Sequence, residues 1–110
     1  MSDFVKVAEK HEVPPGTIKL VDVGGERVGL ANVDGSFHAF SDACTHDGGP
    51  LSEGDLEGAI VTCPWHFSRF DIRTGEIIDS PAEEVIVIYE VDVVDDGVYI
   101  GPVKQVAGPS

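Results

Sequence analysis

Short runs of apolar residues, many of them alternating with polar ones, follow one another along most of the chain. Alternation is typical of half-buried β-strands, because successive side chains of a strand point to opposite faces. β-branched and aromatic residues, which favour strands, are frequent in these runs. The pattern predicts strands at Phe4–Ala8, Thr17–Val23, Arg27–Val33, Ser36–Phe40, Gly58–Cys63, Ser68–Ile72, Glu84–Val94 and Val98–Pro102.

Turn signals separate these runs. The pair Asp34-Gly35 joins two of them, and both residue types tolerate the positive φ that tight hairpins require. Glycine-containing turns are also expected at Gly24–Glu26, Thr74–Glu76 and Asp95–Gly97. The segment "DLEG", Asp55–Gly58, is the one place where we expect a single helical turn, since no segment shows an amphipathic helical stripe.

This pattern predicts an all-β fold, a small barrel or sandwich of about eight to ten short antiparallel strands. With 110 residues, the chain is expected to form one domain over residues 1–110. A hydrophobic fraction of 42% and a charged fraction of 25% are typical of a soluble globular protein. No apolar run is long enough to cross a bilayer, and the first residues do not resemble a signal peptide. We therefore expect a cytoplasmic protein, and a monomer is the simplest expectation.

Charge narrows the choice of partners. The net charge of −13 argues against nucleic acid and against anionic membrane surfaces, because both require cationic protein surfaces. No Lys or Arg occurs between Arg27 and Arg69, a stretch that contains Asp34, Asp42, Asp47, Glu53, Asp55 and Glu57. These acidic residues are either a solubilising surface or an acidic collar that steers a basic partner toward the loops described next.

Both cysteines and two of the four histidines lie in two short motifs within predicted loops. Cys44-x-His46 is followed, after sixteen residues, by Cys63-x-x-His66. Buried structural thiols, or a disulfide, would leave the histidines beside each cysteine unexplained. Structural zinc suits two Cys and two His, but zinc motifs usually pair Cys with Cys and His with His. A [2Fe-2S] cluster with thiolates on one iron and imidazoles on the other takes one Cys and one His from each loop, as here.

The two motifs resemble the C-x-H…C-x-x-H signature of the Rieske [2Fe-2S] family. The segments "LSEG", "CPWHFSRFDIRTGE" and "SPA" are also similar to the small Rieske ferredoxins. The resemblance implies one [2Fe-2S] cluster with Cys44 and Cys63 on one iron and His46 and His66 on the outer iron. It also implies that Pro81 belongs to a loop that covers the cluster.

The resemblance further implies how the reduction potential is set. High-potential members carry an additional cysteine in each motif, where this chain has Gly49 and Trp65, so their disulfide is absent here. Of the serine and tyrosine hydroxyls that donate hydrogen bonds to sulfur in those members, Ser68 is retained and Phe70 replaces the tyrosine. We therefore expect a potential toward the low end of the Rieske range, which is about −150 to +300 mV.

The remaining residues indicate an electron carrier and not an enzyme. An oxygenase needs a second, mononuclear iron, usually held by two His and a carboxylate. Only His11 and His38 remain, each expected on the surface and far apart in sequence. No glycine-rich nucleotide fingerprint follows a predicted strand, which argues against bound NAD(P)H or flavin.

By resemblance, the chain is expected to be the ferredoxin component of a bacterial aromatic-ring-hydroxylating dioxygenase. It would carry single electrons from an NAD(P)H-dependent flavoprotein reductase to the terminal oxygenase. The expected docking patch surrounds His46 and His66, with Trp65 and Phe67 as apolar contacts and Pro81 nearby. Two alternatives stay open here: a Rieske-like small subunit of an assimilatory nitrite reductase, and a zinc-stabilised binding module.

Overall fold

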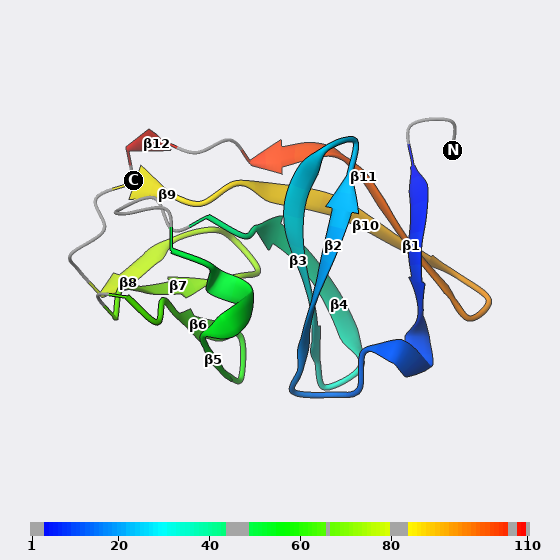
Figure 1. The fold of residues 1–110 in the computed structure, drawn as a ribbon, viewed down its shortest axis with the longest axis horizontal. Helices are drawn as coiled ribbons and strands as arrows, with labels where there is room; N and C mark the ends of the chain where they lie inside the picture. The colour runs from blue at the N-terminus through cyan, green and yellow to red at the C-terminus, as the bar shows by residue number, and fades with distance from the viewer. Residues whose placement is uncertain (1–3, 44–48, 66, 80–83, 106–107, 110) are drawn as a thin grey trace.

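The computed structural model describes residues 4–43, 49–65, 67–79, 84–105 and 108–109. Ten strands form two antiparallel sheets, as predicted (Figure 1). The six-stranded barrel sheet has the order β1-β11-β10-β4-β3-β2. Its strands are β1 (Val5–Glu9), β2 (Ile18–Val23), β3 (Glu26–Val33), β4 (Ser36–Ser41), β10 (Ile88–Val94) and β11 (Gly97–Gln105). Its two edge strands, β1 and β2, contact each other, so this sheet is a nearly closed barrel.

The second sheet, which we call the small sheet, has the order β5-β6-β7-β8. Each of its strands has three residues: β5 (Asp55–Glu57), β6 (Ile60–Thr62), β7 (Arg69–Asp71) and β8 (Ile77–Asp79). Two further short strands, β9 (Glu84–Val85) and β12 (Gly108–Pro109), pair with each other. Two single turns of 3-10 helix, η1 (Lys10–Glu12) and η2 (Leu51–Glu53), complete the described elements.

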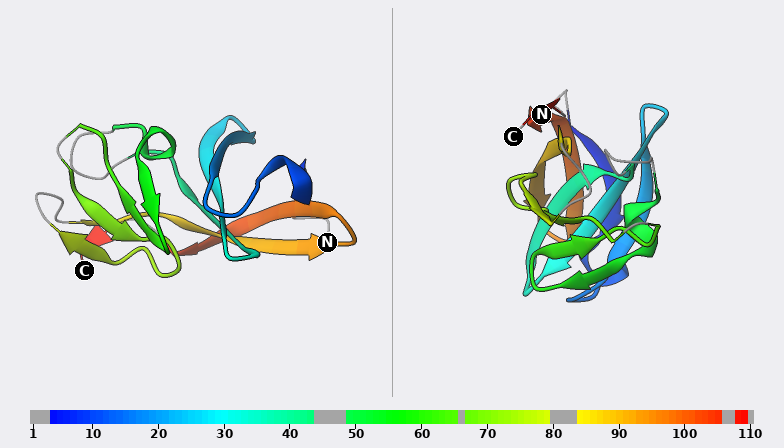
Figure 2. Two further views of the ribbon diagram at one scale, coloured as in Figure 1. Left: turned by 90° about the horizontal axis from the view of Figure 1, so that it is seen from below. Right: turned by 90° about the vertical axis from the view of Figure 1, so that its left-hand side faces the viewer.

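The small sheet lies at one end of the molecule and β1 at the other, as Figures 1 and 2 show. The long strands β10 and β11 connect the two ends and bring the end of the chain close to β9. Among the described residues, no helix is long and apolar enough to span a membrane.

The predicted hairpin turns are confirmed where glycine and aspartate allow positive φ. Asp34 and Gly35 have φ of +52° and +95° between β3 and β4, as a tight primed turn requires. Asp95, which opens the β10–β11 turn, has φ of +55°. The backbone chemistry of these residues therefore fixes the register of the long hairpins.

Two predictions from the sequence were wrong in detail. Asp55–Gly58 forms no helical turn: its first three residues are β5, paired with β6 across a turn in which Gly58 has φ of +62°. The run Glu84–Val94 is not one strand but two, β9 and β10. The break occurs at Ile86, whose buried side chain packs in the core and whose N–H donates to the carbonyl of Gly75 in the turn between β7 and β8.

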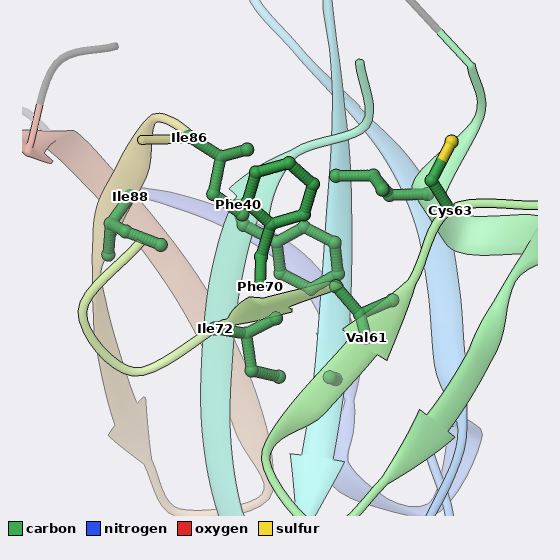
Figure 3. Close-up of a cluster of buried hydrophobic side chains, with 9 residues drawn as sticks. Phe40, Val61, Cys63, Phe70, Ile72, Ile86 and Ile88 are labelled. Carbon is green, nitrogen blue, oxygen red and sulfur yellow. The ribbon is translucent and has the colours of Figure 1, made fainter. Parts of the chain in front are cut away.

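The interior contains two separate clusters of buried apolar side chains. One fills the barrel and comprises Ala8, Val13, Val21, Val28, Leu30, Ala39, Val98 and Ile100. The other lies between the barrel sheet and the small sheet and comprises Ala31, Phe40, Leu51, Val61, Cys63, Phe70, Ile72, Ile86 and Ile88 (Figure 3). One of the two cysteines therefore belongs to the core that joins the two sheets.

Candidate metal centre

The two Cys/His motifs occupy the loops between β4 and η2 and between β6 and β7. Of the four predicted ligands, Cys63 is described by the structure. Cys44, His46 and His66 lie outside the described residues, as does the predicted covering residue Pro81. The geometry of the site is therefore built from Cys63 and from the residues on either side of both motifs.

The base of the first loop is closed by backbone pairing. Ala43 and Pro50 form an antiparallel bridge, so the chain leaves and returns at the same place. Asp42, directly before this bridge, is 4% exposed. Its carboxylate accepts the N–H of Ser52 at 2.7 Å and pairs with the Arg27 guanidinium at 3.2 Å, while its carbonyl accepts the N–H of Leu51. These bonds connect β4, β3 and η2 immediately beside the first motif.

The second loop is a tight turn closed on Cys63. The Cys63 N–H donates to the carbonyl of Ser68 at 2.8 Å, and the Phe67 N–H donates to the carbonyl of Cys63 at 3.0 Å. This turn holds Phe67 at φ of +63°, a backbone conformation that costs a bulky residue about 1–2 kcal/mol. The surrounding bonds therefore impose the loop shape against the local preference of Phe67.

The Cys63 side chain stands at the boundary between core and loop. It is fully buried, and its sulfur points away from the rings of Phe40 and Phe70 (Figure 3). Ser68 is fully buried beside it. Strand β6 thus delivers one thiol, already removed from solvent, to the end of the small sheet.

The described residues at the base of the first loop lie close to Trp65 of the second loop. Ala43 and Pro50, which frame the first loop, line the same hollow as Trp65 of the second. The described residues that flank the two motifs therefore lie close together, and the convergence of the four ligands themselves stays a prediction. A donor set of two thiols and two imidazoles, supplied from two adjacent loops, fits a [2Fe-2S] cluster with mixed sulfur and nitrogen ligands.

The residues predicted to tune the cluster have distinct environments. Gly49 and Ser68 are buried, and Phe70 is packed in the core with Cys63. Trp65 is exposed over 56% of its surface and Phe67 over 69%. Their predicted roles near the cluster, and their effects on the potential, stay a prediction.

Only some residues of the predicted acidic collar are exposed near the two motif loops. Asp42 is buried and structural, because it is the hydrogen-bond acceptor that holds η2. Asp34 lies in the β3–β4 turn, at the opposite end of β4 from the first motif. Glu53, Asp55 and Glu57 are exposed on η2 and β5 and remain candidates for a charged surface near the loops.

His38 is not the ordinary surface residue that the sequence suggested, whereas His11 is exposed as expected. His38 is half-buried on β4. Burial lowers its pKa below the ordinary value; the positive charges of Arg73 and Lys104 act in the same direction and Asp71 opposes them. Neither this environment nor the role of Asp42 has a local sequence signal, since both depend on contacts between distant segments.

Comparison with known proteins agrees with this geometry. The Rieske [2Fe-2S] domain family matches residues 3–91. The chain is 35% identical over 103 residues to "Ferredoxin CarAc" of Metapseudomonas resinovorans, covering 93% of this chain and 96% of that protein. It is 39% identical over 89 residues to the "Biphenyl dioxygenase ferredoxin subunit" of Pseudomonas sp. (strain KKS102), covering 80% and 82%.

A solved structure shows the same fold. A chain of the "Complex of reduced oxygenase and oxidized ferredoxin in carbazole 1,9a-dioxygenase" superposes with a TM-score of 0.89 at 34% identity, covering 96% of this chain and 99% of that one. The chain belongs to the Rieske [2Fe-2S] domain family. Its cofactor is accordingly one Rieske-type [2Fe-2S] cluster, which replaces the zinc alternative left open by the sequence.

Proposed function

We propose that this protein is the ferredoxin component of an aromatic-ring dioxygenase system. It accepts one electron from an NAD(P)H-dependent flavoprotein reductase and delivers it to a terminal oxygenase. The observation that carries the proposal is the Rieske domain match over residues 3–91 of a small β-protein, 93% and 80% of which align with two ferredoxin components of such systems. The likeness to a chain from an oxygenase–ferredoxin complex supports the terminal oxygenase as partner.

We assign Cys44 and Cys63 to one iron and His46 and His66 to the other. The described part of the site supports this, because Cys63 emerges from the core at the loop base while Trp65 is exposed farther along the same loop. Two ferric ions, two sulfides and two thiolates sum to zero charge with neutral imidazoles, whereas four thiolates would leave a dianion. The bound cluster supplies reversible one-electron chemistry at a higher potential than an all-thiolate cluster.

Residues of the chain itself perform three tasks in this role. The core around Cys63 keeps water from the sulfur ligand, because Val61, Phe70 and Leu51 are fully buried with it. The Asp42 bonds hold the base of the first loop. The exposed rings of Trp65 and Phe67 offer an apolar surface next to His66 for transient docking.

The backbone of Phe67 supports a docking role for its side chain. Glycine would adopt its positive φ without strain, yet the chain places a large, mostly exposed aromatic ring there. A strained backbone that presents an exposed apolar ring is a feature of a binding surface.

The proposal is tested by following single-turnover oxidation of the reduced protein in a stopped-flow instrument, with the terminal oxygenase of a carbazole or biphenyl dioxygenase system as acceptor. We expect oxidation at a rate that saturates with oxygenase concentration, and reduction of the oxidised protein by the system's reductase and NADH. Phe67→Gly should weaken docking several-fold while it leaves the visible spectrum of the cluster unchanged.

Leu20→Gly is a suitable control, because Leu20 is an exposed apolar residue on β2 of the barrel. It should not change the rate of electron transfer. Failure of the reduced protein to transfer electrons to any oxygenase of this class, together with stable co-purification with a nitrite reductase, would overturn the proposal.

A further inference from the structure

A hollow lies between the barrel sheet and the described residues that flank the two motifs. It has a volume of about 470 Å³, within the usual range of ligand pockets. Four parts of the chain line it: the β2–β3 turn with the start of β3, the base of the first loop from the end of β4, η2, and Trp65 of the second loop. The lining residues are Gly25, Glu26, Arg27, Ser41, Asp42, Ala43, Pro50, Glu53 and Trp65.

The charges around this hollow are unbalanced. It contains one guanidinium, Arg27, which is already paired with the buried carboxylate of Asp42 at 3.2 Å. Glu26 and Glu53 are exposed and, among the residues that the structure describes, neither takes part in an ion pair. One comes from the barrel sheet and the other from η2, so the carboxylates approach the hollow from two different elements.

Trp65 adds an aromatic surface to the same hollow. Its side chain is exposed over 56% of its surface and borders the hollow next to Ala43 and Pro50. The electron-rich face of an indole attracts cations, and it attracts a planar guanidinium by stacking as well. Carboxylates beside the ring can then accept the N–H groups of the same guanidinium.

From this combination we propose that the hollow receives an arginine side chain of the terminal oxygenase during docking. The inference rests on the proposed function for the identity of the partner and adds to it the chemistry of one contact. Arginine fits better than lysine because a guanidinium can stack on the indole while it donates to two carboxylates. The hollow adjoins the second motif loop, so an arginine held there fixes the orientation of the partner relative to the cluster edge.

The pocket is tested first with a peptide, independently of any oxygenase. The probe is the capped tripeptide Gly-Arg-Gly, with the lysine and citrulline versions for comparison, titrated at low ionic strength. Trp65 is the only tryptophan of the chain, so its fluorescence reports binding at the hollow. We expect a saturable change with the arginine peptide, weaker binding of the lysine peptide, and no saturable change with the uncharged citrulline peptide.

The variants separate the pocket from general charge attraction. Glu26→Gln/Glu53→Gln should weaken arginine-peptide binding about fivefold, as expected when two exposed ion pairs are lost. Glu76→Gln is the matched control, because Glu76 is exposed in the turn between β7 and β8, outside the hollow. It should change the dissociation constant less than twofold. The proposal would be overturned if each charge removed in the double variant weakened peptide binding no more than the single charge removed in Glu76→Gln. Equal dissociation constants for the arginine and lysine peptides would also overturn it.

The second arm uses the oxygenase itself. The double variant should raise the oxygenase concentration at half-maximal electron-transfer rate, with the rate at saturation unchanged, and Glu76→Gln should raise it less. A variant that binds the peptide weakly but transfers electrons normally would overturn the docking role. Arginine-specific peptide binding without electron transfer from the unaltered protein to any oxygenase would instead contradict the proposed function.

Discussion

The barrel sheet and the small sheet are built in different ways. Barrel strands have five to nine residues and enclose an apolar core of their own. The strands of the small sheet have three residues each, and their core is shared with β4 and the segment around β9 and β10. Three-residue strands bury little surface by themselves, so the stability of the small sheet depends on individual side-chain contacts.

Those contacts are polar and close-packed. The Asp42 carboxylate holds η2, the Asp71 carboxylate accepts two hydrogen bonds from the Arg73 guanidinium, and Arg69 pairs with Asp79 at 2.9 Å. From this comparison we expect the barrel to fold without the cofactor, and the small sheet to depend on these polar contacts and on the cofactor that its loops are proposed to bind.

The largest expected effect is that of Cys63→Ser. Loss of a proposed thiolate ligand should abolish incorporation of the cluster, and the visible absorption of the purified protein should disappear. Amide hydrogen exchange should then become fast in β6 and β7 while β3, β4 and β11 keep their protection. Equal loss of protection in both sheets would show that the barrel does not fold independently of the cluster.

The next effect concerns two aspartates that each accept a backbone N–H. Asp42→Ala should lower the free energy of unfolding by about 2–3 kcal/mol, because it leaves the partly buried Ser52 N–H without an acceptor. The lost pair with Arg27, whose side chain is 61% exposed, adds little. Asp22→Ala in the exposed β2–β3 turn, where the carboxylate accepts the Gly25 N–H, should cost about 0.5–1 kcal/mol. Urea unfolding measures both, and equal costs would contradict the contrast between the two sheets.

A smaller effect is expected from Gly54→Ala. A Cβ at Gly54 would lie 1.8 Å from the carbonyl oxygen of Thr62, the residue before Cys63, so β6 must shift. We expect a loss of about 1–3 kcal/mol in the free energy of unfolding, typical of overpacking. A change in the paramagnetic spectrum of the reduced cluster should accompany it.

Gly35→Ala is the control for this variant. Gly35 has φ of +95° in the β3–β4 turn and open space around its Cα, so alanine adds backbone strain without a clash. It should also destabilise the protein, but the spectrum of the cluster should not change. A spectral change in Gly35→Ala alone would be the opposite of what the structure predicts.

The smallest effect is the pH dependence contributed by His38. Its pKa is lowered in the folded protein by burial and by Arg73 and Lys104, against the attraction of Asp71, so the unfolded chain binds its proton more readily. The contribution of His38 to the free energy of unfolding is therefore fully present above the ordinary histidine pKa of about 6.5 and decreases as the pH falls below that value.

His38→Gln should accordingly reduce the acid-induced decrease in the free energy of unfolding between about pH 7.5 and pH 5.5. His11→Gln, at an exposed position, should leave that decrease unchanged. Urea unfolding of the two variants at both pH values compares them directly, and identical pH profiles would contradict the lowered pKa of His38.

The sequence predictions were more accurate for the barrel sheet than for the small sheet and the segment around β9. The barrel hairpins were predicted because alternation and Asp-Gly turns are local signals. The turn predicted at Asp55–Gly58 was wrong because β5 exists only through its pairing with β6. Likewise, the break between β9 and β10 depends on a hydrogen bond from Ile86 to Gly75, which no local pattern records.

The candidate site was predictable in its chemistry but not in its supports. The spacing of Cys44, His46, Cys63 and His66 identified the type of cluster, and the family match confirmed it. The burial of Asp42 was not predictable, because its partners Arg27 and Ser52 come from other elements and its charge favours an exposed position.

The most direct test of the proposed ligand set is a pulsed paramagnetic resonance experiment on the reduced protein, which detects nitrogen nuclei bound to iron. The spectrum should show two histidine nitrogens, and both couplings should change when the histidines carry ¹⁵N. A cluster without nitrogen coupling, or with coupling to one nitrogen alone, would contradict the assignment of His46 and His66 to the outer iron.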